Sequence, residues 1–123
     1  MKDIIKKINN DSIENLQICY IDYSGRLCGK IIPKHKFEAT FSDGIVFAKA
    51  NLSFGLDDHF ADDAKFLANT GDFLAMPDPG SYSILPHRKG TARLISFMLD
   101  NDKTEWEGCP RTQLKNIVNK FLE

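Results

Sequence analysis

Several features that define common protein classes are absent from this sequence of 123 residues. It has no run of about 18 consecutive apolar residues, as a membrane-spanning helix would require, and residues 1–10 lack the apolar stretch of a signal peptide. Its three cysteines are odd in number, widely spaced and without a C-x-x-C pair, so neither a disulfide framework nor a zinc site is indicated. These absences predict a cytoplasmic protein with reduced thiols.

The sequence also lacks an excess of charge of either sign and any biased segment. Sixteen Lys and Arg residues against 17 Asp and Glu residues leave a net charge of -1, which argues against binding to nucleic acid or to a membrane surface. It has no block of like charge and no internal repeat, and 42% of its residues are hydrophobic. This composition predicts one packed domain over residues 1–123.

The hydrophobic pattern predicts helices at both ends of the chain and strands between them. Isoleucines at helical spacing indicate a short helix over residues 2–10, within a helical arm of residues 1–14. Pro110 opens a second helix, whose apolar stripe runs from Leu114 to Phe121. Strands are predicted at residues 16–23, 27–32, 45–48, 73–76, 82–85 and 91–99.

Two segments between these strands have other patterns. Residues 34–41 carry Phe37 and Phe41 at helical spacing and indicate a short helix or turn, whereas the polar residues 51–71 indicate an exposed loop with one helical turn around 61–67. The whole order describes an α+β fold, with a mixed sheet of about four to six strands and helices at the ends.

An acidic cluster in the long loop is the first candidate for chemistry. If the loop were helical, Asp58 would lie beside Asp62 and His59 beside Asp63, so that these residues, with Asp57, could hold a divalent cation. The glycine and carboxylate register of a calcium loop is missing, however. A solvated acidic loop is therefore the simpler interpretation.

A basic turn is the second candidate. His87, Arg88 and Lys89, with Arg93 further on, could bind a phosphate or a carboxylate, although a basic turn between strands is the more common structure. No nucleophile elbow or phosphate-binding glycine loop is present. The chain could still be a small independent enzyme that uses the acidic loop and this basic turn.

Three further residues attract attention because of their type. Cys19 and Cys28 fall within apolar strand patterns, so we expect them to be buried small hydrophobes rather than reactive thiols. Trp106 precedes the last helix and is either a core anchor or an aromatic residue that docks against a partner.

Four motifs in order along the chain carry a resemblance to a known family. They are YIDYSG at residues 20–25 with Ile-Pro at 32–33, DGIVF at 43–47, GDFLAMPD at 71–78, and CPR at 109–111. Together they resemble the opening hairpin, the Gly-x-x-Phe strand, the Asp-x-x-x-x-Pro-Asp segment and the Pro-Arg helix start of the N-terminal β-grasp domain of the glutamine synthetase family. The resemblance spans about residues 16–121.

This resemblance implies an ATP-dependent ligase that joins glutamate to ammonia or to an amine. In that family ATP and Mg or Mn are bound by a larger catalytic domain, which this chain does not contain. The resemblance therefore implies that this domain binds no cofactor or metal and has no catalytic residue of its own. It implies instead a homo-oligomer in which the domain packs against the catalytic domains of its own and a neighbouring subunit and forms one wall of that neighbour's active site.

The residues of that wall follow from the motifs position by position. Where the family has Asp-Gly-Ser-Ser, this chain has Ala48 and then Lys49, Ala50 and Asn51, so the acid that helps to bind and deprotonate ammonium is missing. This difference favours an amine as the acceptor, or another γ-glutamyl ligase. Asp72 matches the second acidic position, or else only caps a turn.

Lys49, Asn51 and Ser53 are the remaining candidates to face a neighbour's substrate. Pro77 and Asp78 are expected to be structural, with the proline fixing a turn and the aspartate bonding nearby N–H groups. The alternative function is a free-standing β-grasp module for interaction or regulation, without enzymatic activity. A reading frame that continues past Glu123 into a Gly-x-Glu-x-Glu strand would favour the ligase, and a stop codon there would favour the module.

Overall fold

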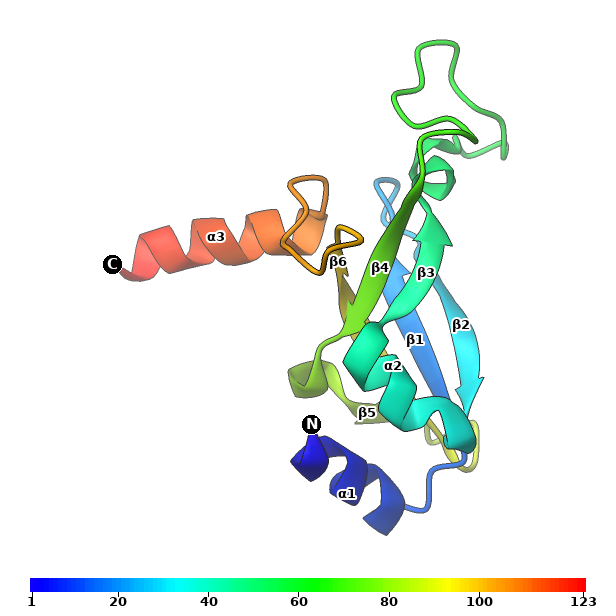
Figure 1. Cartoon of the computed structure of the whole chain (residues 1–123), viewed down its shortest axis with the longest axis vertical. Coiled ribbons are helices and arrows are strands. Elements are labelled where there is room, and N and C mark those ends of the chain that lie inside the picture. Colours follow the sequence, from blue (N-terminus) through cyan, green and yellow to red (C-terminus); the bar gives the residue numbers. More distant parts are fainter.

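The computed structural model describes residues 1–123 and consists of one sheet with three α-helices (Figure 1). The α-helices are α1 (Lys2–Asn10), α2 (Phe37–Asp43) and α3 (Pro110–Leu122). The strands are β1 (Asn15–Ile21), β2 (Leu27–Pro33), β3 (Ile45–Ala48), β4 (Asp72–Pro77), β5 (Ser83–Ile84) and β6 (Thr91–Leu99). Short 3-10 helices are η1 (Lys34–Lys36), η2 (Lys49–Ser53) and η3 (Pro79–Ser81).

The six strands form one mixed sheet in the order β2-β1-β6-β4-β3, and β5 pairs with β6. β1 and β6 are parallel, and every other pair is antiparallel. The first half of β6 pairs with β1 and β5, whereas its second half pairs with β4. This arrangement confirms the predicted α+β class and resembles the β-grasp domain.

The sheet is curled, so that its edge strands β2 and β3 approach each other. The Lys30 side chain bridges them: its Nζ donates a hydrogen bond of 2.8 Å to the Val46 carbonyl oxygen and lies 4.5 Å from the Phe47 ring centroid. A lysine that covers a strand edge in this way also shields unpaired backbone groups.

Two apolar clusters fill the inside of the fold. One joins α1 and α2 to the sheet and contains Ile4, Ile8, Ile13, Leu16, Ile18, Ile32, Phe37, Ala92 and Leu94. The other is largely aromatic and contains Tyr20, Phe47, Leu52, Phe73, Ala75, Met98, Trp106 and Cys109. The Tyr20 ring contacts Phe47 and Phe73 edge to face, at 4.8 and 5.1 Å between centroids, and the Phe47 and Phe73 rings stack at 5.8 Å.

Most predicted elements are confirmed, but one is wrong and one is shorter than predicted. Residues 61–67 form turns rather than helix, and Phe66 in this segment is bound to Ser53 through its N–H and to Trp106 through its ring. The strand predicted at 82–85 is reduced to Ser83–Ile84. Tertiary contacts therefore override the local pattern of residues 61–67, and only two residues of 82–85 pair with β6.

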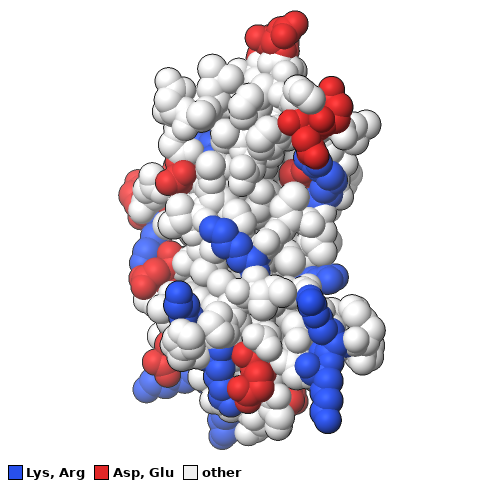
Figure 2. Space-filling view, turned by 90° about the vertical axis from the view of Figure 1, so that its right-hand side faces the viewer, with Lys and Arg blue, Asp and Glu red and all other residues white.

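Helix α3 begins at Pro110 as predicted and extends away from the sheet (Figure 1). The apolar stripe of this helix is not covered, since its side chains are between 45% and 87% exposed: Leu114, Ile117, Val118 and Phe121. None of the helices combines the length and apolar character that spanning a bilayer requires. The uppermost charged side chains are acidic, and most Lys and Arg side chains lie lower (Figure 2).

Candidate functional site

The residues predicted to line a site lie at the upper end of the sheet, where β3 ends and β4 begins (Figure 1). Ala48, the last residue of β3, stands directly opposite Asp72, the first residue of β4. The Lys49 N–H donates a hydrogen bond of 2.9 Å to the Gly71 carbonyl oxygen and extends this pairing by one step. The backbone therefore brings Ala48, Lys49 and Asp72 together, and Asp72 is exposed.

Lys49 has inward-directed partners. Its Nζ lies 3.0 Å from the Asp100 carboxylate and 4.7 Å from the centroid of the Trp106 ring, and its side chain is only 17% exposed. The charge of Lys49 is therefore matched within the chain, and its stem covers the aromatic cluster. This packing supports a structural role for Lys49, and its role in facing a neighbour's substrate stays a prediction.

Asn51 and Ser53 lie on η2, directly after Lys49. Burial raises the pKa of Tyr20 to about 12, and a hydrogen bond with Asn51 opposes that shift. The Ser53 Oγ accepts a hydrogen bond of 3.2 Å from the Phe66 N–H, which ties the long loop to η2. Both candidates therefore help to hold the loop and the core beneath it.

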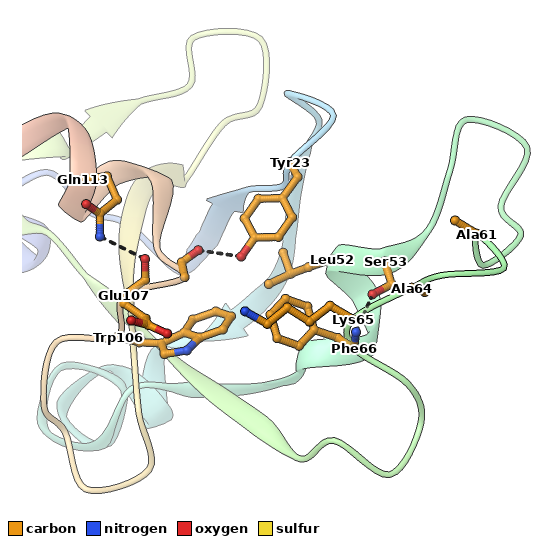
Figure 3. Close-up of a pocket in the computed structure, with 11 residues that line it drawn as sticks. Tyr23, Leu52, Ser53, Ala61, Ala64, Lys65, Phe66, Trp106, Glu107 and Gln113 are labelled. Carbon is orange, nitrogen blue, oxygen red and sulfur yellow. Dashed lines mark hydrogen bonds between the residues drawn. The ribbon is translucent and has the colours of Figure 1, made fainter.

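A pocket of about 690 Å³ opens between η2, the long loop and the start of α3 (Figure 3). It is lined by Tyr23, Leu52, Ser53, Ala61, Ala64, Lys65, Phe66, Trp106, Glu107, Gly108 and Gln113. Across its rim the Tyr23 hydroxyl donates to the Gly108 carbonyl oxygen at 2.7 Å, and Gln113 Nε2 donates to the Glu107 carbonyl oxygen at 2.9 Å. Only Ser53 of these residues was singled out from the sequence as a wall residue.

Trp106 is a core anchor rather than an exposed docking residue. It is buried, its ring stacks on Phe73 with 6.0 Å between centroids, and Phe66 contacts it edge to face at 5.5 Å. The sequence left both roles open for this residue. The contact with Phe66 also fixes one wall of the pocket.

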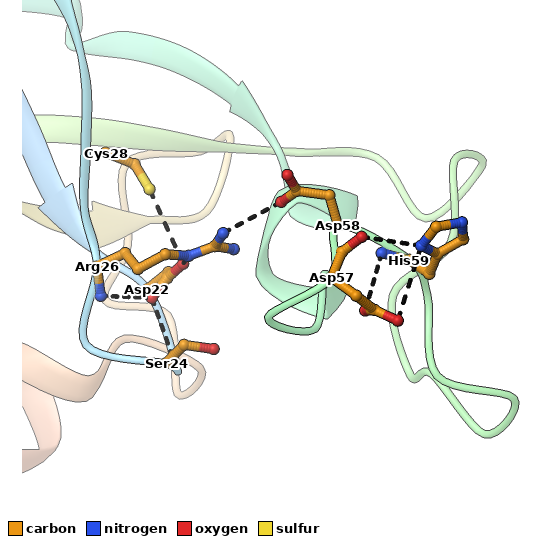
Figure 4. A network of polar contacts seen from close by, with 7 residues as sticks. All are labelled: Asp22, Ser24, Arg26, Cys28, Asp57, Asp58 and His59. Atoms are coloured by element: carbon orange, nitrogen blue, oxygen red, sulfur yellow. Dashed lines mark hydrogen bonds and ion pairs between the residues drawn. The ribbon is translucent and has the colours of Figure 1, made fainter.

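A buried carboxylate organises the turn between β1 and β2 (Figure 4). Asp22 is 4% exposed and accepts hydrogen bonds from the N–H groups of Ser24 and Arg26 at 2.9 and 2.8 Å and from Arg26 Nε at 2.8 Å. Burial disfavours its ionised form, but these hydrogen bonds outweigh that effect and lower the pKa of Asp22. The sequence indicated the turn, whereas the burial of Asp22 has no local signal.

The acidic residues of the long loop are not gathered into one cluster. Asp58 pairs with Arg26 at 3.2 Å, and the Asp57 carbonyl oxygen lies 2.9 Å from His59 Nδ1 (Figure 4). Residues 57–63 are not helical and are exposed, so the helical pairing with Asp62 and Asp63 does not form and the simpler interpretation of a solvated acidic loop is confirmed. No group of three or more His, Cys, Asp or Glu side chains is placed to share a metal ion.

The basic turn is not assembled into a site either. Arg93 lies on β6 and donates through Nε to Gln17 Oε1 at 3.1 Å, whereas residues 87–89 are exposed in the turn before it. Cys19 is buried, as predicted, and burial raises the pKa of its thiol. Cys28 is only half-buried, which corrects the prediction, because β2 is an edge strand of the sheet; its Sγ lies 3.9 Å from the Asp22 carboxylate.

No protein-family model matches this chain. It is 27% identical over 119 residues to a glutamine synthetase of Halobacterium salinarum and 27% identical over 123 residues to type-1 glutamine synthetase 2 of Dictyostelium discoideum. A γ-glutamylanilide synthase of an Acinetobacter species is 21% identical over 132 residues. These alignments cover 94–98% of this chain but only 24–26% of each relative, so the chain spans about a quarter of their length.

Solved structures have the same fold. A glutamine synthase homologue superposes with a TM-score of 0.76 over 88% of this chain and 26% of that chain, at 23% identity. GmaS without ligand and GmaS in complex with ADP give TM-scores of 0.79 and 0.75, each over 98% of this chain at 22% identity, and cover 26% and 25% of those chains. The chain is therefore homologous, over nearly its whole length, to the N-terminal quarter of glutamine synthetases, and it has the fold of the corresponding quarter of GmaS.

Proposed function

We propose that residues 1–123 are the N-terminal domain of a glutamine-synthetase-like, ATP-dependent ligase that joins glutamate to ammonia or an amine. The observation that carries this proposal is the homology itself, which spans nearly all of this chain and only a quarter of each relative. The exposed apolar stripe of α3 supports it, because such a stripe is suited to packing against further protein. The ligase is a homo-oligomer in this proposal.

In this proposal the upper end of the sheet forms one wall of a neighbouring subunit's active site. Asp72, Lys49, Asn51 and Ser53 belong to the β3–η2–β4 junction or the loop beside it, where Asp72 is exposed. Asp72 offers a carboxylate to the acceptor's ammonium group, since a positioned carboxylate can bind a cation and take a proton from it. Lys49, Asn51 and Ser53 fix the loop that carries this wall.

The acceptor is an amine or ammonia, and Ala48 bears on the choice. An alanine side chain cannot hold an ammonium ion, so Asp72 is the one carboxylate at this paired position. The relative named γ-glutamylanilide synthase and the presence of Ala48 both favour an amine.

ATP and a divalent metal belong to the remaining part of the parent in this proposal. The solved complex of GmaS with ADP supports a nucleotide for the parent. This chain brings no three metal-ligating side chains together, so its own residues do not fit such a site. Their part is to present the acceptor side of the wall.

Two experiments test the proposal. The first is the reading frame: continuation past Glu123 into a catalytic domain supports the ligase, and a stop codon supports the free-standing module instead. The second measures ATP hydrolysis by the full-length protein with glutamate and either ammonium or a panel of amines. We expect Asp72→Asn to lower kcat/KM for the acceptor by about 10²-fold or more, as loss of a general base does.

Asp102→Asn is the matched control for that substitution. Asp102 is also an exposed aspartate and lies in the turn between β6 and α3, where its carboxylate accepts hydrogen bonds from Thr104. We expect this variant to keep the activity within about twofold. Equal effects of the two substitutions would contradict the role given to Asp72.

A further inference from the structure

A partly buried ion pair joins the start of α3 to the sheet. Arg111, in the first turn of α3, donates through Nη2 to the Asp78 carboxylate at 2.7 Å and through Nη1 to the Ile95 carbonyl oxygen at 3.0 Å. Its guanidinium lies 4.4 Å from the centroid of the Phe97 ring. One side chain therefore joins α3 to the end of β4 and to two residues of β6.

Asp78 is itself held in place by the turn that follows β4. Its Oδ1 accepts a hydrogen bond of 2.9 Å from the Gly80 N–H, and its own N–H donates to the Ile95 carbonyl oxygen at 3.0 Å. The carboxylate and guanidinium are about a quarter and a third exposed, at 27% and 31%. The Asp78 carboxylate is thus held without Arg111, so less side-chain entropy is lost when the pair forms.

Few other contacts fix the direction of α3. From Gln113 onward the residues of the helix are exposed, including its apolar stripe. Lys115 is the most distant residue of the helix with a charged or aromatic partner on the rest of the chain, namely Glu105 at 3.3 Å and the Phe97 ring at 5.6 Å. A helix of 13 residues is about 20 Å long, so a small change of angle at Arg111 moves its far end by several ångströms.

We infer that Asp78 and Arg111 are positioning residues that set the angle at which α3 leaves the sheet, and so align the apolar stripe of α3 with the rest of the parent protein. This inference rests on the proposed function for the identity of the covering surface. The geometry of the ion pair stands independently of it. A planar guanidinium bonded at two separate oxygens specifies orientation, which the single charge of a lysine does not.

The orientation can be measured on this chain directly. Spin labels are attached to cysteines introduced by Glu38→Cys on α2 and Asn119→Cys on α3. The half-buried Cys28 is replaced by serine so that it is not labelled, and Cys19 and Cys109 are protected by their burial. We expect Arg111→Lys and Asp78→Asn to make the inter-label distance distribution about twofold wider than in the parent sequence, with helix content unchanged. The amide introduced by Asp78→Asn retains an acceptor oxygen for the Gly80 N–H, so the turn is preserved.

Asp58→Asn is the matched control, because it weakens the exposed ion pair between Arg26 and Asp58 at 3.2 Å, which joins the β1–β2 turn to the long loop and includes no residue of α2 or α3. We expect it to leave the distribution unchanged. An unchanged distribution in both Arg111→Lys and Asp78→Asn would overturn the inference, whatever the parent catalyses. In the full-length ligase the same two substitutions should lower kcat by about tenfold, since small misplacements of a site wall are costly. An absence of ligase activity from the unmodified full-length protein would instead contradict the proposed function.

Discussion

Ala48 and Asp72 face each other directly across the antiparallel pair of β3 and β4. Residues opposite each other on such a pair have Cβ atoms about 4.5–5.5 Å apart, so a carboxylate at position 48 would lie beside that of Asp72. The residue at position 48 therefore decides whether this end of the sheet presents one carboxylate or two.

Ala48→Asp is expected to have opposite effects on stability and on ammonium use. In the chain itself, two like charges directly opposite should lower the free energy of unfolding by about 0.2–1 kcal/mol, measured by urea denaturation at pH 7. In the full-length ligase, kcat/KM for ammonium should rise by about tenfold relative to an amine, because a second carboxylate can bind the ion. Efficient use of ammonium by the unmodified enzyme would contradict the importance given to Ala48.

Asp22→Asn should strongly lower the stability of the folded chain. It removes the charge from a carboxylate that is 4% exposed and accepts three hydrogen bonds. We expect the free energy of unfolding at pH 7 to fall by about 2–4 kcal/mol, since hydrogen bonds to a buried charge are individually strong. Glu14→Gln, which breaks an exposed pair with Lys34, is the control and should change it by less than about 1 kcal/mol.

The pH dependence of stability should also reflect Asp22. Its pKa is lower in the folded chain than the usual value near 3.9 expected when unfolded, so the unfolded state binds more protons between these two values. The contribution of Asp22 is therefore complete above about pH 5 and is lost as the pH falls from about 4 through the folded pKa. Denaturation at a series of pH values should show a shallower acid loss in Asp22→Asn than in the parent sequence.

The sequence was sufficient for elements whose signals are local. Gly25 adopts the positive φ of 79° that the turn after β1 requires, and Pro110 starts α3 at the predicted position. β1 ends at Ile21 rather than at residue 23, because the Asp22 carboxylate binds the N–H groups of the following turn. Such side-chain capping shortens strands without changing their hydrophobic pattern.

What the sequence could not provide depends on contacts between distant residues. The pattern of α3 predicted a helix but not that its stripe would remain exposed, since periodicity does not say what covers an apolar face. Asp78 and Arg111 belong to two motifs 33 positions apart, and no local pattern in the sequence relates one to the other. The position opposite Ala48 likewise follows from strand register, which only the pairing of β3 and β4 determines.

Phe66→Ala should loosen the long loop without unfolding the sheet. The Phe66 ring contacts Trp106 at 5.5 Å and Tyr23 at 6.4 Å, and these contacts hold residues 61–71 against the pocket. We expect hydrogen exchange in this segment to become at least about tenfold faster, because few other apolar contacts protect it. Leu67→Ala is the control, since Leu67 is exposed, and unchanged exchange in Phe66→Ala would show that the loop is held elsewhere.

Two buried threonines on helices provide a final test of how polar groups affect this fold. Thr112 in α3 is 3% exposed and its Oγ1 has no hydrogen-bond partner, whereas Thr40 in α2 is 2% exposed and its Oγ1 donates to the Lys36 carbonyl oxygen at 2.8 Å. Valine has nearly the same shape as threonine, and both residues are β-branched, so helix propensity changes little.

Thr112→Val should raise the free energy of unfolding by about 1 kcal/mol, because burial of an unpaired hydroxyl is unfavourable. Thr40→Val should lower it by about 1 kcal/mol through loss of its hydrogen bond. Urea denaturation of the two variants in parallel measures both signs, and a loss of stability in Thr112→Val would show that its hydroxyl has a partner after all.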